Sequence, residues 1–228
     1  MKKALIVSNP FLPADNPAVS RSVSFIKLLR NYGWESVIFT RETAAADTSA
    51  DPAGLEIPDG IDIYRTNPWE LDELPGLLGL AGKYLAEWVL APDKKRLWEL
   101  SSHRKAAKII KYDGIDLIYT ASSSKSSHLL GLYLKKRFPQ IPWIADICLE
   151  LPVNTGKAGV EKRFDRRISE MADCIVTNTE GMLDAILESN LGRNMEDRCF
   201  IIPDGFTEEL SAVFEKSCRL LAAKRLVQ

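Results

Sequence analysis

Residues 116–146 read DLIYTASSSKSSHLLGLYLKKRFPQIPWIAD, and this stretch decides the fold. Residues 116–120 form a short apolar run bounded by a glycine and a group of serines, which predicts a buried strand. Leucines and aromatic residues then recur at helical spacing as far as Phe138, and prolines end that pattern before a second apolar run at 142–146. The stretch therefore predicts a strand, a loop, a helix and a second strand in succession.

Hydroxyl groups gather where the first of these strands passes into the helix. Ser122, Ser123 and Ser124 precede Lys125, and we expect one serine to cap the helix. Ligands of open parallel sheets bind beyond the carboxyl ends of the strands, which is where the serine loop and Asp146 both fall. The loop is a candidate site for an anion or a sugar hydroxyl, and Asp146 is a candidate base or hydroxyl acceptor. For both, the alternative is a purely structural capping role.

The same alternation of strands and helices continues through the rest of the chain. Further short apolar runs predict strands at 4–8, 37–40, 61–65, 173–178 and 199–202. Short apolar strands separated by helices predict an α/β fold, a Rossmann-like doubly wound parallel sheet of about seven strands with helices on both faces. We expect one domain over residues 1–206 and a C-terminal helix over residues 207–228 that packs back on it.

The composition is typical of a soluble globular protein. The chain has 228 residues, of which 46% are apolar, and a net charge of −1. No secretory signal is evident, and the most apolar long stretch, residues 77–91, is shorter than the roughly 20 residues that a membrane span needs. Four scattered cysteines and two histidines indicate neither a metal site nor a disulfide framework. We therefore expect a cytoplasmic protein.

The charged residues are distributed unevenly. Acidic residues dominate 42–73, whereas lysines and arginines dominate 94–167. A basic surface in the second half of the molecule is suited to the phosphates of a ligand or to anionic lipid headgroups, and the alternative is a set of solvated helix faces. Peripheral contact with the inner face of the membrane stays open on this basis, and we expect no nucleic-acid partner.

Two further segments bear on the ligand. Ser8, Asn9 and Pro10 follow the first strand in place of a glycine-rich phosphate fingerprint, which argues against NAD and ATP. Thr177 and Asn178 end a predicted strand just before a predicted helix. They repeat the polar pattern of the serine loop and are further candidates for ligand binding, again with helix capping as the alternative.

Several segments together resemble the N-terminal domain of GT-B fold glycosyltransferases, specifically the family-4-like bacterial enzymes of surface polysaccharide or glycolipid synthesis. The similar segments, in order, are 3–8, 31–35, 92–93, 121–136, 142–146, 172–177 and 202–206. Pro17 and Ala18 stand where that family usually has a pair of glycines. Asp146 matches the first aspartate of a family motif whose arginine and second aspartate are replaced here.

The resemblance implies a role in sugar transfer. In that family a sugar passes from a nucleotide donor to an acceptor hydroxyl with retained configuration and without a metal, and the first domain binds the acceptor. It implies an acceptor pocket formed by Asn16, Arg21, the loop from Ser122 to Lys125 and Asp146, the last as the candidate catalytic residue. Lys157 or Arg21 is expected nearest to any phosphate.

The resemblance also implies that this sequence covers half of a catalytic cleft. The nucleotide-sugar donor is bound mainly by a second domain in that family, so we expect no cofactor and no metal on this chain and no activity by it alone. The expected partners are a sugar or lipid-linked acceptor and a second GT-B domain or subunit. The alternative is a non-catalytic binding or subunit module that pairs with a separate donor-binding chain.

Overall fold

One parallel sheet forms the centre of the molecule. The computed structural model describes residues 1–9, 11, 17–42, 57–67, 96–122, 125–147, 166–189 and 195–204. In this part of the chain, seven strands pair in parallel in the order β3-β2-β1-β4-β5-β6-β7. The strands are β1 (Lys2–Val7), β2 (Trp34–Arg41), β3 (Asp62–Thr66), β4 (Leu117–Ser122), β5 (Trp143–Ile147), β6 (Cys174–Thr177) and β7 (Cys199–Ile201). The Rossmann-like parallel sheet of seven strands predicted from the sequence is confirmed.

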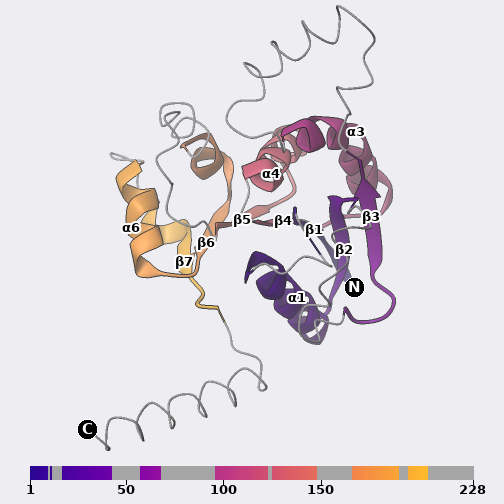
Figure 1. Ribbon diagram of the computed structural model, residues 1–228, viewed down its shortest axis with the longest axis horizontal. Helices are drawn as coiled ribbons and strands as arrows, with labels where there is room; N and C mark the ends of the chain where they lie inside the picture. The colour runs from indigo at the N-terminus through magenta and orange to yellow at the C-terminus, as the bar shows by residue number, and fades with distance from the viewer. Residues whose placement is uncertain are drawn as a thin grey trace, which may run out of the picture.

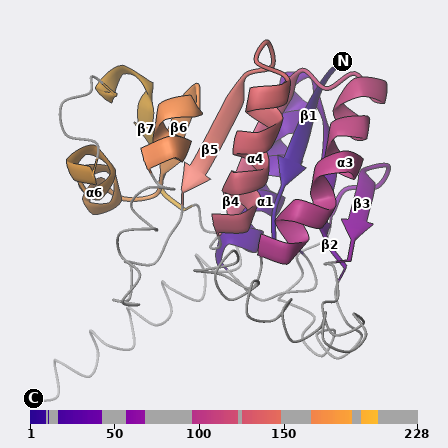
Figure 2. The same ribbon diagram turned by 90° about the horizontal axis from the view of Figure 1, so that it is seen from above.

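The helices lie on both faces of this sheet. Helix α1 lies on one face, and α3 and α4 lie side by side on the other (Figure 1, Figure 2). The described helices are α1 (Pro17–Leu29), α3 (Arg96–Tyr112), α4 (Lys125–Arg137) and α6 (Glu180–Ser189), with short 3-10 helices at η1 (Arg30–Tyr32) and η4 (Glu196–Arg198). Residues 166–171 are also helical. These positions agree with the periodicity of the sequence.

Strand β1 explains why its sequence reads as an unbroken apolar run. Successive side chains of a strand point to opposite faces of the sheet. Leu5 and Val7 belong to the core that includes residues of α3 and α4, whereas Ala4 and Ile6 belong to the core that includes residues of α1. All four are fully buried. A central parallel strand covered on both sides has no polar face, so it shows no alternation.

A glycine ends the first helical segment. Gly33 follows η1 with a φ of 78° and donates its backbone N–H to the carbonyl of Arg30. This left-handed conformation carries little steric cost for glycine, and it turns the chain directly into β2.

The serine loop after β4 is shorter than the sequence predicted. Ala121 and Ser122 stay in the ladder because they pair with Asp146 and Ile147 of β5. Helix α4 begins at Lys125, so only residues 123 and 124 separate the two elements. Pairing with a neighbouring strand extended β4 beyond the point where its apolar sequence ends.

Some expectations concern residues outside the described part. The predicted C-terminal helix over residues 207–228 belongs to them. None of the described helices is long and apolar enough to cross a lipid bilayer.

Gly131 allows α4 to approach the sheet closely. A Cβ atom at this position would lie 2.7 Å from Thr120 Cγ2 and from two ring atoms of Trp143. The Trp143 indole is fully buried and donates to Thr120 Oγ1 at 3.0 Å, and His128 Nδ1 lies 2.9 Å from that same oxygen. The histidine therefore acts as a packing residue here, and these mutually bonded side chains leave little room to yield.

We predict that Gly131→Ala destabilises the protein although alanine is the better helix former. Overpacking of a tight core costs about 1–3 kcal/mol, and three contacts at 2.7 Å place this position at the upper end of that range, above the gain of about 1 kcal/mol from helix propensity. The melting temperature should fall by roughly 2–8 °C in a chain of this size. Gly181→Ala in α6 is the matched control, because a Cβ there meets no atom within 4 Å. Equal melting temperatures for both variants would contradict the packing argument.

Candidate functional site

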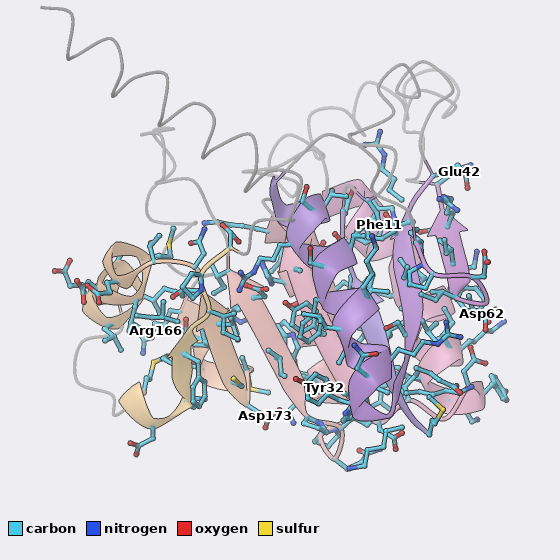
Figure 3. The ribbon with its side chains drawn as sticks, turned by 90° about the horizontal axis from the view of Figure 1, so that it is seen from below. Phe11, Tyr32, Glu42, Asp62, Arg166 and Asp173 are labelled. Carbon is cyan, nitrogen blue, oxygen red and sulfur yellow. The ribbon has the colours of Figure 1, made fainter. Side chains whose placement is uncertain are left out.

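The candidate site lies at the edge where the parallel strands end. All strands run the same way, so their carboxyl ends meet at one edge of the sheet. Figure 3 shows Phe11 and Glu42, which follow β1 and β2, at this edge, and Tyr32 and Asp173, which precede β2 and β6, at the opposite edge. Polar residues that follow the strands are therefore brought together by topology alone.

Asp146, near the end of β5, is the centre of this site. Its side chain is fully buried, and Arg21 of α1 donates from Nε to its Oδ2 at 2.7 Å. The hydroxyl of Tyr119 on β4 donates to the same oxygen. A buried carboxylate needs an opposite charge and hydrogen bonds to offset its lost hydration, and these two side chains supply them.

The spacing of α1 explains how Arg21 reaches this carboxylate. Arg21 and Phe25 are four residues apart, so they lie on the same face of the helix. The ring of Phe25 stacks on Tyr119 with a centroid distance of 4.3 Å and an angle of 15° between the planes. Helix and sheet are therefore joined by an apolar contact and an ion pair, one helical turn apart.

A second carboxylate binds the outer side of the same guanidinium. Arg21 Nη1 donates to Asp204 Oδ1 at 2.9 Å, and Asn178 Nδ2 donates to Asp204 Oδ2 at 2.9 Å. Asp204 follows β7 and its side chain is 46% exposed, whereas that of Arg21 is 9% exposed. Arg21 thus bridges a buried acid on β5 and an exposed acid at the rim.

The structure brings three of the residues predicted from the sequence into one network, namely Arg21, Asp146 and Asn178. Lys125 begins α4 and is half-buried. Thr177 is buried and donates to the carbonyl of Thr179, beside the start of α6. Its register partner is Ile201, so it projects from the face opposite to Asp146, which shares a register with Val176.

The remaining predicted site residues cannot be placed. Asn16, Ser123, Ser124 and Lys157 lie outside the described residues, and of Ser122 only the backbone is described, as the last residue of β4.

Sequence reasoning missed Tyr119, Phe25 and Asp204 as members of the network. The two aromatic residues fit the apolar pattern of a strand and a helix, so nothing in the local sequence separates them from ordinary core residues. Asp204 carried a signal, because it follows the last strand as Asn178 follows β6.

A further polar contact lies on the same edge. Asn9, which follows β1, donates from Nδ2 to the hydroxyl of Ser126 in α4 at 3.2 Å, and both side chains are buried. This contact links the end of β1 to the start of α4, and it gives two buried polar side chains a hydrogen-bond partner.

The described residues offer no obvious metal site or reactive thiol. Among them, no group of three or more His, Cys, Asp or Glu side chains is placed to hold a metal ion. Burial raises the pKa of the Cys174 and Cys199 thiols above the usual value. The neighbouring Cys199 raises the pKa of Cys174 further, whereas Arg198 partly offsets the rise for Cys199. A thiol with a raised pKa is a poor nucleophile at neutral pH.

A hollow of about 100 Å³ opens at the opposite edge of the sheet. It is lined by residues at the amino ends of β1, β2 and β3, among them Lys3, Trp34 and Asp62, together with Ile26 and Arg30. Because it lies at the amino ends of the strands, it is separate from the site around Asp146.

No protein-family model and no curated protein sequence matches this chain. Solved structures do match it in fold. HepE of Anabaena, in complex with UDP and glucose, is 14% identical with a TM-score of 0.54, over 90% of this chain and 45% of that protein. The UDP-GlcNAc 2-epimerase of Neisseria meningitidis, bound to UDP-GlcNAc, is 12% identical with a TM-score of 0.55, over 87% and 46%. MnaA of S. aureus, with UDP, is 11% identical with a TM-score of 0.56, over 94% and 52%.

These matches show the fold. The described sheet and its helices have the architecture of a single GT-B-like lobe, and the chain spans about half the length of the solved structures that it matches.

The Arg21 network predicts an asymmetry in stability. Arg21→Met removes the guanidinium from the buried Asp146 carboxylate, and we expect the free energy of unfolding to fall by about 3 kcal/mol or more. Asp204→Ala removes a half-exposed carboxylate from Arg21 and Asn178 and leaves no buried charge unpaired, so it should cost less than about 1 kcal/mol. Urea unfolding measures both values. Arg30→Met, which removes an exposed arginine just after α1, is the control and should change stability by less than about 0.5 kcal/mol. Equal losses for Arg21→Met and Arg30→Met would show that Asp146 does not depend on Arg21.

Proposed function

We propose that this chain is the acceptor-binding half of a retaining glycosyltransferase of the family-4-like type, in surface polysaccharide or glycolipid synthesis. The observation that carries the proposal is the position of Arg21. Asp146 holds its guanidinium at the carboxyl edge of an open parallel sheet, which is the edge where ligands of such sheets bind.

Arg21 is the group best suited to touch the ligand. A guanidinium presents a rigid fork of N–H donors that matches the oxygens of a phosphate or carboxylate. Asp146 is fully buried behind it, so it can reach a substrate only if Arg21 moves. The geometry therefore favours Asp146 as a positioning residue for Arg21, and it supports a phosphorylated acceptor such as a lipid-linked sugar.

The comparisons support a sugar ligand without identifying it. HepE is described in complex with UDP and glucose, and the epimerase from N. meningitidis with UDP-GlcNAc. At 14% identity or less, what those proteins bind is only a guide for this chain. The collinear segments of the sequence, from Lys3 to Phe206, support the glycosyltransferase reading over other GT-B-like functions.

The donor site is expected elsewhere. The matched structures are about twice as long as this chain, so a second lobe or a separate donor-binding chain would complete the cleft. A module that pairs with such a chain without taking part in chemistry is the alternative within this proposal. In either case the nucleotide sugar binds only once the second wall is present.

A second candidate function follows from the matched structures. Several of them are UDP-GlcNAc 2-epimerases, which favours a lobe that binds a UDP-sugar itself. The two candidates differ in which part of a ligand contacts the lobe. An acceptor lobe contacts the sugar and phosphate of an acceptor. A lobe of the second kind binds a UDP-sugar, uridine included, without a second lobe.

Saturation-transfer NMR distinguishes these candidates. We expect transfer to the sugar protons of a short-chain lipid diphosphate sugar, and little transfer to the uridine protons of UDP-GlcNAc. Asp146→Asn removes the charge that orients Arg21 and should weaken acceptor binding about tenfold, since a hydrogen bond to a charged group contributes about 1.5–3 kcal/mol. Asp59→Asn, at an exposed turn before β3, is the matched control and should bind as the wild type does. Unchanged binding by Asp146→Asn, or dominant uridine signals, would argue against the acceptor role.

We also expect the 228-residue chain by itself to turn over no nucleotide sugar. One wall of a cleft neither excludes water nor holds both substrates in a reactive geometry. Release of UDP from UDP-glucose or UDP-GlcNAc, measured with and without an acceptor sugar, tests this. Turnover by the purified chain would mean that the described lobe contains a complete active site.

A further inference from the structure

Asp204 occupies a cradle made by two donors from distant parts of the chain. Arg21 Nη1, from α1, donates to one carboxylate oxygen at 2.9 Å, and Asn178 Nδ2, from the end of β6, donates to the other at 2.9 Å. Two donors that bind the two oxygens of one carboxylate form a receptor for an anion that offers two oxygens at once, as a carboxylate or a phosphate does. The cradle is therefore filled by a side chain of the protein itself.

Arg21, the cationic wall of this cradle, is held in place independently of Asp204. Asp146 holds Arg21 from behind through Nε at 2.7 Å, and the Arg21 side chain is only 9% exposed. Asn178 is half-buried and directly follows Thr177, which is fully buried in β6. The Arg21 guanidinium is thus held by a buried carboxylate, and the backbone of Asn178 is placed by the buried strand that it follows.

The occupant is held more loosely than the walls. The Asp204 side chain is 46% exposed, and it lies beyond the last residue of β7, two residues after Ile202, which is 50% exposed. An ion pair at such an exposed position contributes about 0–1 kcal/mol, because water competes for both partners. Another anion therefore displaces Asp204 if its own interaction with Arg21 and Asn178 is only slightly more favourable in free energy.

We propose that Arg21 and Asn178 form an anion subsite, and that Asp204 fills it until a phosphate group of the ligand takes its place. This rests on the proposed function in one respect, namely that the phosphate belongs to a sugar ligand. A dianionic phosphate attracts the Arg21 guanidinium more strongly than a carboxylate with one charge, and it offers oxygens to both donors.

The internal carboxylate also makes the subsite selective. Asp204 is tethered to the chain, so its local concentration near Arg21 is high and a weak anion competes poorly with it. An uncharged sugar has no group that replaces a carboxylate on Arg21. Asp204 therefore weakens the binding of any ligand that has to displace it from Arg21, and a doubly charged phosphate is best able to do so.

Titration with inorganic phosphate and with glucose 1-phosphate, followed by NMR at low ionic strength, tests the proposal. Asp204→Ala empties the cradle and should bind both ligands up to about fivefold more tightly than the wild type, the ratio that corresponds to a pair of about 1 kcal/mol. Asp59→Ala removes one exposed negative charge at the opposite edge of the sheet and should leave both affinities unchanged. Asp204→Asn is the second variant and should show a smaller gain of the same sign.

A further variant separates the cradle from general electrostatics. Asn178→Ala in the Asp204→Ala background should cancel most of the gain, because it removes one of the two donors without changing the charge. An equal gain in Asp204→Ala and Asp59→Ala, no gain in either Asp204 variant, or a gain that survives the loss of Asn178 would each overturn the proposal.

The two ligands also separate this inference from the proposed function. Inorganic phosphate reports on the cradle alone, whereas the acceptor role requires additional transfer to sugar protons. A gain for phosphate without any sugar contact would keep the anion subsite and reject the acceptor role. Transfer to sugar protons without a gain in phosphate affinity would keep the acceptor role and reject the anion subsite.

Discussion

A carboxylate placed inside a parallel sheet has to be matched by a cation, and this requirement determines how α1 lies on the sheet. Asp146 is fully buried, and the cost of removing a charge from water amounts to several kcal/mol unless a partner and hydrogen bonds offset it. Arg21 and Tyr119 supply both, and Phe25 packs on Tyr119 one turn along the helix. The ion pair and the ring stack together define one position of α1 over β4 and β5. The rest of the candidate site follows from that position, because Arg21 then reaches the rim.

Much of the fold is predictable because its causes are local in sequence. The central strands are covered on both faces, so they appear as short apolar runs, and the helices show their packing in the spacing of leucines. Gly33 ends the first helical segment because its left-handed conformation suits glycine. The serine loop was misjudged for a reason that local sequence does not contain. Ala121 and Ser122 are polar or small, yet β5 offers them ladder partners, and pairing across the sheet prevails over their composition.

The candidate site was predictable only in parts. Asp146 and Asn178 stand at strand ends, and parallel topology alone brings such residues to one edge. Arg21 was placed in one pocket with Asp146 through a family resemblance, but its contact with Asp204 was not foreseen, because it depends on packing between elements. Its two acids lie 125 and 183 residues away along the chain. The ring of Tyr119 packs in the core and its hydroxyl donates to Asp146. The apolar pattern of the sequence predicts only the packing role.

The contact between Arg21 and Asp204 helps to hold the short last strand, β7, at the edge of the sheet. Phe200 shares its register with Val176 and so projects from the same face as Asp146, but it is 52% exposed, and Ile202 is 50% exposed. A strand of three residues at the edge of a sheet, with little apolar cover, is expected to detach by local opening more readily than the centre. Asp204 ties residues 202–204, which follow β7, to α1 through Arg21. Whatever anion replaces Asp204 on Arg21 also frees that end of the sheet, so occupancy of the rim would be visible as faster amide hydrogen exchange in β7.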